Sequence, residues 1–317
     1  MSLQDNYKVF SFMPVYHIGG FTIKSPIELP NISHSMIKTS PVDALDIEIK
    51  GIPSYKTSQP PIAIEGGEVQ WVEDGFRLFH RRVGEMLLLK DTVYWQQSDP
   101  TDVPGFRTFL LNTLLPAYAV LKGFLSLHIS AISFEGRAIA FQGNSGAGKS
   151  TLAAMLMKRG FPVLTEDLGI VEMKDDTAVM RPGVPCFRLW KQTFRHIDET
   201  PQKHNLAWAH RGKYYRDIEA ENFCSEQQPI YAMYFLREPE DGKEISIKAI
   251  SGFKAASAIL HSNFFGVPQN SDSESKTIFN DVMVLANQIK CFELIRPKDY
   301  AMAEQVCDAL IKHWKTS

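Results

Sequence analysis

The sequence contains few cysteines and none of the spacings that zinc ligands or disulfide frameworks require. Its four cysteines, Cys186, Cys224, Cys291 and Cys307, form no CxxC pair, and no histidine accompanies them at metal-ligand spacing. A chain of 317 residues can bury a large core without such cross-links. We therefore expect four reduced thiols, most of them buried, and no zinc site.

Long apolar runs are missing too. The N-terminal segment has no hydrophobic signal-peptide core. The most apolar stretch, 106–134, holds only 14 uncharged residues between Arg107 and Lys122, fewer than the roughly 18 that a membrane-spanning helix needs. We predict a buried helix in this stretch, followed by a turn at Gly123 and a strand. The expected protein is cytoplasmic and has no membrane partner.

Neither sign of charge is in excess. Lys and Arg total 34, Asp and Glu total 36, and the net charge is −2. Proteins that coat long nucleic acids carry a strong positive balance, so we expect no nucleic-acid partner and only a local basic site. The composition, 44% hydrophobic and 22% charged, is that of a globular protein, and the length suggests roughly two domains.

The hydrophobic pattern changes near residue 98. Residues 1–98 are predicted to form a small β-rich domain, because segments such as 45–49 alternate apolar and acidic residues between turn-like breaks. The segment 98–105 is predicted to be a linker. Residues 99–317 mix helical and strand patterns, so the expected fold class is α/β, with the second domain carrying the chemistry.

A glycine-rich octet in the second domain has the phosphate-loop pattern. The apolar segment 137–141 predicts a strand, and GNSGAGKS at 143–150 matches G-x-x-x-x-G-K-[ST]. A helix follows and ends at Gly160, a common helix terminator. Because the motif requires a strand before it and a helix after it, this context favours a nucleotide site over a plain glycine-rich turn.

Each residue type in the octet has its own chemical reason. Gly143, Gly146 and Gly148 allow backbone angles that a side chain forbids, so that the N–H groups of the loop converge on an anion. The Lys149 ammonium can reach the β- and γ-phosphates, and the Ser150 hydroxyl can bind Mg²⁺. The residues expected to bind ATP are Gly143, Asn144, Ser145, Gly146, Ala147, Gly148, Lys149, Ser150 and Thr151.

An acidic pair follows the helix. Residues 161–173 predict a second apolar strand that carries Glu166 and Asp167, and only 17 residues separate Lys149 from Glu166. One helix and one crossover fit this gap, so the strand is expected to run parallel to the first and near it. One carboxylate can hold Mg²⁺ while the other accepts a proton. Strand alternation predicts that only one of the two faces the phosphates.

Three features lie downstream of the acidic pair. Arg188 is a candidate phosphate clamp. The segment 203–216 contains Lys203, Arg211, Lys213 and Arg216, and it is either a phosphate or acidic-peptide clamp or a solvated loop. Toward the C-terminus, 270–276 is predicted to be a polar loop and 299–314 an amphipathic helix.

The spacing of His128, the octet, the helix and the acidic pair resembles the C-terminal catalytic domain of HPr kinase/phosphorylase, a bacterial protein-serine kinase. The resemblance implies a fold akin to phosphoenolpyruvate carboxykinase, Glu166 as catalytic base or acid, and His128, Asp167 and Lys149 as its catalytic partners. It also implies Ser150 and Asp167 as metal ligands. The sequence departs from the family pattern, because Glu166 replaces an Asp and Ile129 follows His128 in place of a Gly.

The plan of the whole chain is similar to HPr-kinase-like proteins of lasso-peptide gene clusters, on the segments 18–30 and 184–190. Those proteins phosphorylate a serine of a precursor peptide, and family relatives are hexamers, which implies a homo-oligomer. The expected activity is an ATP- and Mg²⁺-dependent kinase acting on a peptide or small-protein serine. A P-loop small-molecule kinase and a non-catalytic ATP-binding regulator stay open as alternatives.

Overall fold

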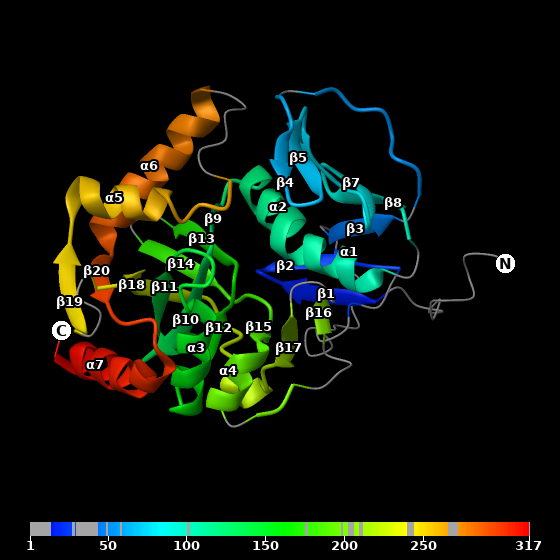
Figure 1. The fold of residues 1–317 in the computed structure, drawn as a ribbon. Helices are drawn as coiled ribbons and strands as arrows, with labels where there is room; N and C mark the ends of the chain where they lie inside the picture. Colours follow the sequence, from blue (N-terminus) through cyan, green and yellow to red (C-terminus); the bar gives the residue numbers. More distant parts are fainter. Residues whose placement is uncertain are drawn as a thin grey trace. The chain divides into compact units, whose positions relative to one another are not determined.

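The computed structural model describes residues 14–26, 29, 44–48, 50–57, 59–99, 102–174, 177–197, 199–201, 206–208, 212–239, 244–265 and 272–316. Contacts divide the chain into two compact units, with the first boundary between residues 124 and 125. Figure 1 shows the elements of both units, and each unit is described separately below. The protein is mixed α/β and rich in sheet.

The first unit is built on one eight-stranded sheet in the order β1-β2-β3-β8-β7-β6-β5-β4. The strands β4 to β8 form an antiparallel meander, whereas β2–β3 and β3–β8 are parallel. The β-rich pattern predicted from the sequence is confirmed here. The strands are β1 (Val15–Ile18), β2 (Phe21–Lys24), β3 (Ala44–Glu48), β4 (Ile62–Ile64), β5 (Gly67–Val72), β6 (Gly75–His80), β7 (Gly84–Leu89) and β8 (Thr92–Gln97).

The predicted buried helix is continuous but changes its winding before Pro116. It consists of α1 (Val103–Phe109), a π-helical turn η2 (Leu110–Leu114) and α2 (Leu115–Leu121). Proline lacks the N–H for an i→i−4 bond, and a π-turn is one way in which a helix accommodates this loss. The helix ends before Gly123, whose φ of 80° forms the predicted turn.

This helix belongs to the first unit. The ring of Phe106 stacks on Trp95 of β8, with centroids 4.0 Å apart and an interplanar angle of 17°. The carboxylate of Asp102 accepts a hydrogen bond from the Gly105 N–H at 3.0 Å and caps the helix. The boundary expected between residues 98 and 99 therefore falls inside the first unit, and α1 already begins at Val103, within the expected linker 98–105.

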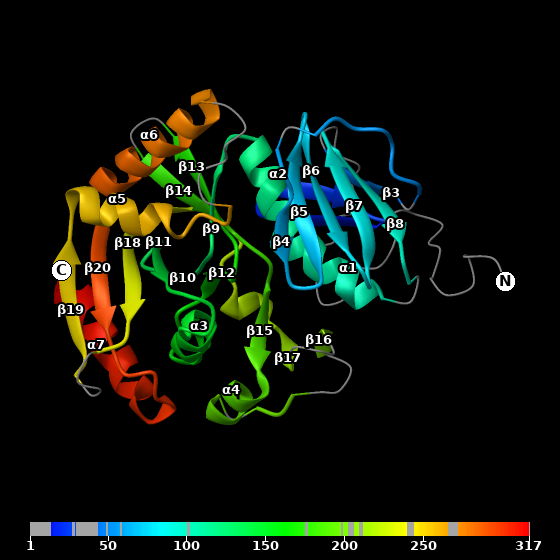
Figure 2. The same ribbon diagram turned by 45° about the horizontal axis from the view of Figure 1, so that its top comes forward.

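The second unit contains a nine-stranded sheet in which β12-β10-β11-β18-β14-β13-β9 form one path and β20 pairs with β18 and β19. Figure 2 shows these strands from a second side. The strands are β9 (Leu125–Leu127), β10 (Ile129–Phe134), β11 (Arg137–Gln142), β12 (Val163–Thr165), β13 (Gly169–Lys174), β14 (Thr177–Arg181), β18 (Gln228–Arg237), β19 (Ser246–Ile250) and β20 (Lys290–Ile295). The helices are α3 (Lys149–Lys158), α4 (Lys191–His196), α5 (Gly252–Leu260), α6 (Asp272–Gln288, of which residues 276–288 belong to this unit) and α7 (Ala303–Thr316), with 3-10 turns η4 (Ala220–Asn222) and η5 (Tyr300–Met302).

Both faces of the central strands are buried. In β11, Ile139 and Phe141 belong to the hydrophobic cluster that contains α3 and α7, while the alternate residues Ala138 and Ala140 are fully buried outside this cluster. Strands buried on two sides have continuous apolar sequences, which explains the run at 137–141. The octet that follows β11 therefore starts from a rigid strand in the middle of the sheet.

The second apolar strand lies parallel to the first, but one strand away. The strand β10 pairs antiparallel with both β11 and β12, so β11 and β12 run in the same direction with β10 between them. The expectation of one continuous strand over 161–173 is wrong. The chain forms β12 and then β13, and a turn at 166–168 separates them.

Near the C-terminus one expectation is wrong and one is confirmed. Residues 272–276 of the predicted loop are the first residues of α6, and 270 and 271 lie outside the described residues. The predicted amphipathic helix is α7, preceded by η5. None of the helices within the described ranges is long and apolar enough to span a membrane.

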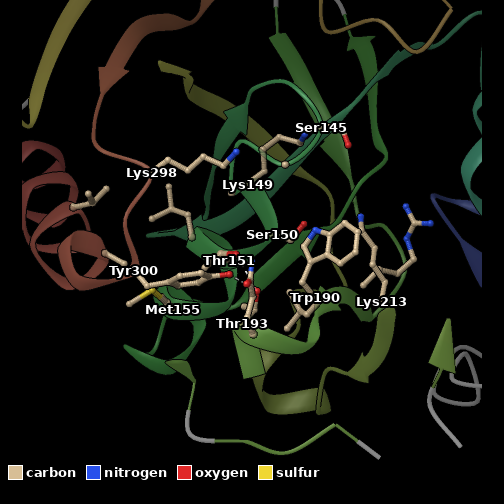
Figure 3. Close-up of a pocket in the computed structure, with 18 of the residues that line it drawn as sticks. Ser145, Lys149, Ser150, Thr151, Met155, Trp190, Thr193, Lys213, Lys298 and Tyr300 are labelled. Atoms are coloured by element: carbon tan, nitrogen blue, oxygen red, sulfur yellow. Dashed lines mark hydrogen bonds between the residues drawn. The ribbon is translucent and has the colours of Figure 1, made fainter. Parts of the chain in front are cut away.

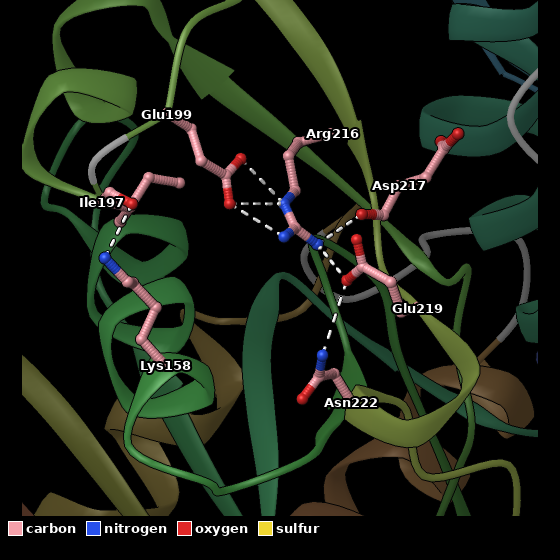
Figure 4. Close-up of polar contacts among 7 residues, drawn as sticks. All are labelled: Lys158, Ile197, Glu199, Arg216, Asp217, Glu219 and Asn222. Atoms are coloured by element: carbon pink, nitrogen blue, oxygen red, sulfur yellow. Dashed lines mark hydrogen bonds and ion pairs between the residues drawn. The ribbon is translucent and has the colours of Figure 1, made fainter.

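A small sheet of β15 (Cys186–Trp190), β17 (Lys213–Asp217) and β16 (Leu206–Trp208) completes the second unit. Figure 4 shows the contacts of Arg216 in β17 with Glu199 and Glu219. The Arg216 guanidinium contacts the Glu199 carboxylate at 2.8 Å and the Glu219 carboxylate at 2.7 Å. Arg216 is thus a structural residue here. Lys203 and Arg211 of the basic segment lie outside the described residues.

We expect Arg216→Met to lower the free energy of unfolding by about 1–3 kcal/mol, because the half-buried Glu199 loses its partner and the exposed Glu219 loses an ion pair. Urea denaturation measures this change. The control is Lys56→Met, which removes a cation from an exposed pair with Glu73 and should cost less than about 1 kcal/mol. Equal losses in the two variants would contradict the structural role of Arg216.

Candidate functional site: a cation-lined cavity at the phosphate loop

The loop 143–148 connects β11 to α3, and its last residues line a cavity of about 290 Å³. Gly146 and Gly148 have φ values of 79° and 91°, so both have the left-handed backbone that favours glycine. The expectation of such angles is wrong for Gly143, whose φ is not positive. Gly143 is needed for space instead, because a Cβ there would lie 2.8 Å from the Ala147 Cβ.

Lys149 is the first residue of α3 and is buried, with 5% of its surface exposed. Its Nζ donates a hydrogen bond to the Gly143 carbonyl at 2.7 Å, which closes the loop over the start of the helix. Burial, together with the charge of Lys213, lowers the pKa of Lys149 to about 8. Ser145, Ser150 and Thr151 line the same cavity, so the loop and helix present an ammonium and three hydroxyls to a ligand.

The acidic pair lies on a tight turn between β12 and β13. The Leu168 N–H donates to the Glu166 carbonyl at 2.8 Å, and Asp167 between them has a φ of 68°. These are the features of a γ-turn, in which the central residue is strained. The Thr165 hydroxyl donates to the Leu168 carbonyl and helps to hold the turn. The turn gives the two neighbouring carboxylates different surroundings.

Glu166 is turned into the protein. It is 5% exposed, and its Oε2 accepts a hydrogen bond from the buried Ser130 hydroxyl at 2.6 Å. It does not line the cavity. Its charge still acts on the site. It raises the pKa values of Lys149 and His128, although burial lowers both by more.

Asp167 faces the cavity and is held by two side chains. Its Oδ1 is 3.1 Å from His128 Nε2, and its Oδ2 accepts from the Arg188 guanidinium. Burial lowers the pKa of His128 to about 4, with further contributions from the Lys149 and Arg188 charges, so the ring is neutral at pH 7. A carboxylate can only accept, so the ring proton is assigned to Nε2.

His128 and Arg188 come from different parts of the fold. His128 is the residue between β9 and β10, and its N–H donates to the Ser262 carbonyl at 2.7 Å. Its ring packs on Phe264 with centroids 5.2 Å apart. Arg188 is in the middle of β15, in the small sheet. The tertiary structure thus brings His128, Asp167 and Arg188 to the same cavity as Lys149 and its loop.

Two further residues of the small sheet border the cavity. Trp190, at the end of β15, is 44% exposed, and the Lys213 ammonium lies over its ring at 5.4 Å. Figure 3 shows both on the same side of the pocket, next to Ser150. Of the predicted basic segment, Lys213 lines the cavity and Arg216 does not.

Sequence reasoning missed the side of the cavity formed by the C-terminal region. Arg296, Lys298 and Tyr300 line it after the end of β20, and the Arg296 guanidinium donates to the carbonyl of Ala147 in the loop. A signal was available, because ligands in α/β sheets bind beyond the carboxyl ends of parallel strands. β20 is parallel to β18, which is parallel to β11, so the residues after Ile295 belong to the same edge as the octet.

A magnesium ion fits the donor set of this cavity. Ser150 and Asp167 both line it and offer a hydroxyl and a carboxylate. Mg²⁺ bound with a nucleotide takes one or two protein oxygens and completes its shell with phosphates and water. It therefore does not need a group of three or more His, Cys, Asp or Glu ligands, and none exists among the residues that the structure describes.

The four cysteines are free thiols, and Cys186, Cys291 and Cys307 are buried. Burial raises the pKa of Cys291 and of Cys307 to about 12, so both stay protonated near neutral pH. None of the four lines the cavity, so its chemistry does not involve a thiol.

Comparison with known proteins identifies no family. No protein-family model matches the chain, and no curated protein matches it. Among solved structures, the chain is similar to the HPr(Ser) kinase/phosphatase from Coxiella burnetii, with 10% sequence identity and a TM-score of 0.35; the match covers 60% of this chain and 97% of that one. A similarity at this level does not establish a shared activity, and the family resemblance seen in the sequence stays a proposal.

Proposed function

We propose that the protein is an ATP- and Mg²⁺-dependent kinase that transfers the γ-phosphoryl group to a serine hydroxyl of a peptide or small protein. One observation carries this proposal: Lys149 of the phosphate loop and the carboxylate of Asp167 line the same cavity. Phosphoryl transfer requires positioning and charge stabilisation of the phosphates together with a carboxylate that accepts the proton of the acceptor.

The charges around the cavity favour a polyphosphate. Its cationic residues outnumber its acidic residues, although the whole chain has a net charge of −2. The N-terminus of α3 adds the positive end of a helix dipole. The cationic residues are Lys149, Arg188, Lys213, Arg296 and Lys298, and the acidic residues are Asp167 and Asp299.

Ser150 and one carboxylate oxygen of Asp167 would hold Mg²⁺, which supplies neutralisation of the charge that develops on the phosphates, and the other oxygen of Asp167 stays available for the acceptor proton. Arg188 contacts Asp167 and also lines the cavity. Phosphate oxygens compete with Asp167 for this guanidinium, because Arg binds both groups through the same N–H fork. Arg188 can therefore move from the carboxylate to a phosphate when a triphosphate binds.

The structure favours Asp167 over Glu166 as the general base. The family resemblance implies Glu166, the first member of the pair, as the base or acid. Glu166 does not line the cavity and is buried against Ser130, whereas a base must come within hydrogen-bond reach of the acceptor proton. The neutral His128 donates to Asp167 and keeps its carboxylate oriented toward the cavity.

The acceptor class is supported by the exposed side of the cavity. Trp190 and Lys213 border the site beside Asp167 and Arg188, and an exposed aromatic ring with a nearby cation suits a polypeptide that carries acidic residues. A sugar or nucleoside kinase would share the same loop and carboxylate. Incubation with radiolabelled ATP and candidate acceptors separates these two classes, because only one kind of acceptor becomes labelled.

We expect Lys149→Ala to abolish phosphoryl transfer, because the ammonium that reaches the phosphates is lost. Asp167→Asn should lower the rate by about 10²–10⁴-fold, the usual contribution of a general base. Glu166→Gln keeps the size of the side chain and its Ser130 partner, and should cause a much smaller loss. The measurement is label transfer from ATP at saturating acceptor.

The comparison of Asp167→Asn with Glu166→Gln assigns the base. A larger loss in Glu166→Gln would return that role to Glu166. Full turnover in both variants and in Lys149→Ala would remove the kinase proposal altogether.

Polyphosphate binding should weaken as pH rises through about 8. Below this pH the Lys149 ammonium is charged, and above it the amine becomes neutral because its pKa is about 8. The measurement is calorimetric titration with inorganic tripolyphosphate between about pH 7 and pH 9.5, a range in which unperturbed lysines stay charged. Lys149→Gln should bind more weakly and show no such pH dependence. A wild-type affinity that is constant across this range would contradict the lowered pKa.

A further inference from the structure

Part of the cavity lies away from the phosphate loop and is mostly apolar. Met155 of α3 and Ala303 and Val306 of α7 line it, together with Tyr300 of η5 and Thr193 of α4. We call these five residues the base slot. None of the five is charged, in contrast to the cations that line the cavity around the loop. In Figure 3 Met155, Tyr300 and Thr193 are grouped together, apart from Lys149 and Ser145.

The Tyr300 ring is held in one orientation. The ring of His196 stacks on it with centroids 4.0 Å apart and an interplanar angle of 4°. His196 does not line the cavity, so it covers the side of Tyr300 that points away from the slot. The Tyr300 hydroxyl is 2.9 Å from the hydroxyl of Thr193, which is 1% exposed. The ring is therefore ordered before any ligand arrives, which lowers the entropic cost of stacking on it.

The slot is lined by a part of α3 that lies farther along the helix from the loop. Ser150, Thr151 and Met155 all line the cavity from α3. From Ser150 to Met155 an α-helix rises about 7.5 Å, so a ligand with its phosphates at the loop extends along the first turns of α3. Both parts belong to the same cavity, and the Thr151 hydroxyl of one lies 3.4 Å from the Thr193 hydroxyl of the other.

We propose that the base slot binds the adenine ring of the nucleotide, with Tyr300 and Met155 packing against the ring and the Thr193 and Tyr300 hydroxyls as its polar partners. This inference rests on the proposed function, because it assumes a nucleoside triphosphate at the loop. Apolar walls with a few fixed polar groups are typical of small-molecule sites. Aromatic stacking and a nearby thioether suit a flat, polarizable base.

The test compares two ligands that share a triphosphate and differ in the nucleoside. ATP and inorganic tripolyphosphate, each with Mg²⁺, are titrated into the full-length protein by calorimetry. Wild-type protein should bind ATP more tightly than tripolyphosphate. Tyr300→Ala should weaken ATP binding about 10–100-fold, as expected for the loss of one base-stacking ring, and leave tripolyphosphate binding unchanged.

Three further variants make the result specific. Tyr300→Phe keeps the ring but removes one of the two polar partners, and should weaken ATP binding less than Tyr300→Ala does. Ala303→Leu fills the slot and should weaken ATP binding but not tripolyphosphate binding, which gives a second measurement if Tyr300→Ala does not fold. Phe253→Ala removes an exposed ring outside the cavity, and should change neither affinity. Thermal unfolding checks that each variant is folded.

Two results would overturn the base slot alone. One is equal binding of ATP and tripolyphosphate by the wild type. The other is that Tyr300→Ala and Ala303→Leu weaken the binding of both ligands equally, or weaken neither. A wild-type protein that binds neither ligand would overturn the nucleotide site itself, and the proposed function with it.

Discussion

The left-handed backbone of Asp167 is the constraint on which the rest of the site depends. Two adjacent carboxylates repel each other if they share one environment. The turn between β12 and β13 separates them: Glu166 lies in the interior with the Ser130 hydroxyl, and Asp167 lies in the cavity with His128 and Arg188. Asp tolerates a positive φ better than most residues, because its short polar side chain can bond locally. Backbone strain stored in this way is typical of functional sites.

The pKa values of the groups around the cavity follow from their burial and from the cations near them. Lys149 is buried and close to other cations, so its ammonium is poised to lose its proton near pH 8. His128 stays neutral in the same field and can only donate one hydrogen bond toward Asp167. A polyanion entering such a site replaces water around cations that are already partly desolvated, which makes each attraction stronger than at the surface.

The scaffold explains how distant segments reach one cavity. β11, β18 and β20 run parallel, and their carboxyl ends place the octet and the residues after β20 side by side. The small sheet contributes Arg188, Trp190 and Lys213 to the cavity. Arg216 stabilises this sheet through ion pairs with Glu199 and Glu219. The hydrophobic core and these ion pairs therefore hold the elements that surround the cavity.

The sequence by itself determined the local chemistry: the octet between a strand and a helix, the acidic pair after it and the amphipathic C-terminal helix. These features depend on spacing and periodicity, which a single sequence carries. Only the tertiary structure decided which carboxylate faces the cavity. Strand alternation predicts opposite faces for the two residues, but it does not predict the turn at Asp167 that determines which one enters the cavity. It also decided that the C-terminal residues Arg296 and Tyr300 line the same cavity as the loop. They lie far from 143–151 in the sequence, and strand order, not a local pattern, brings them there.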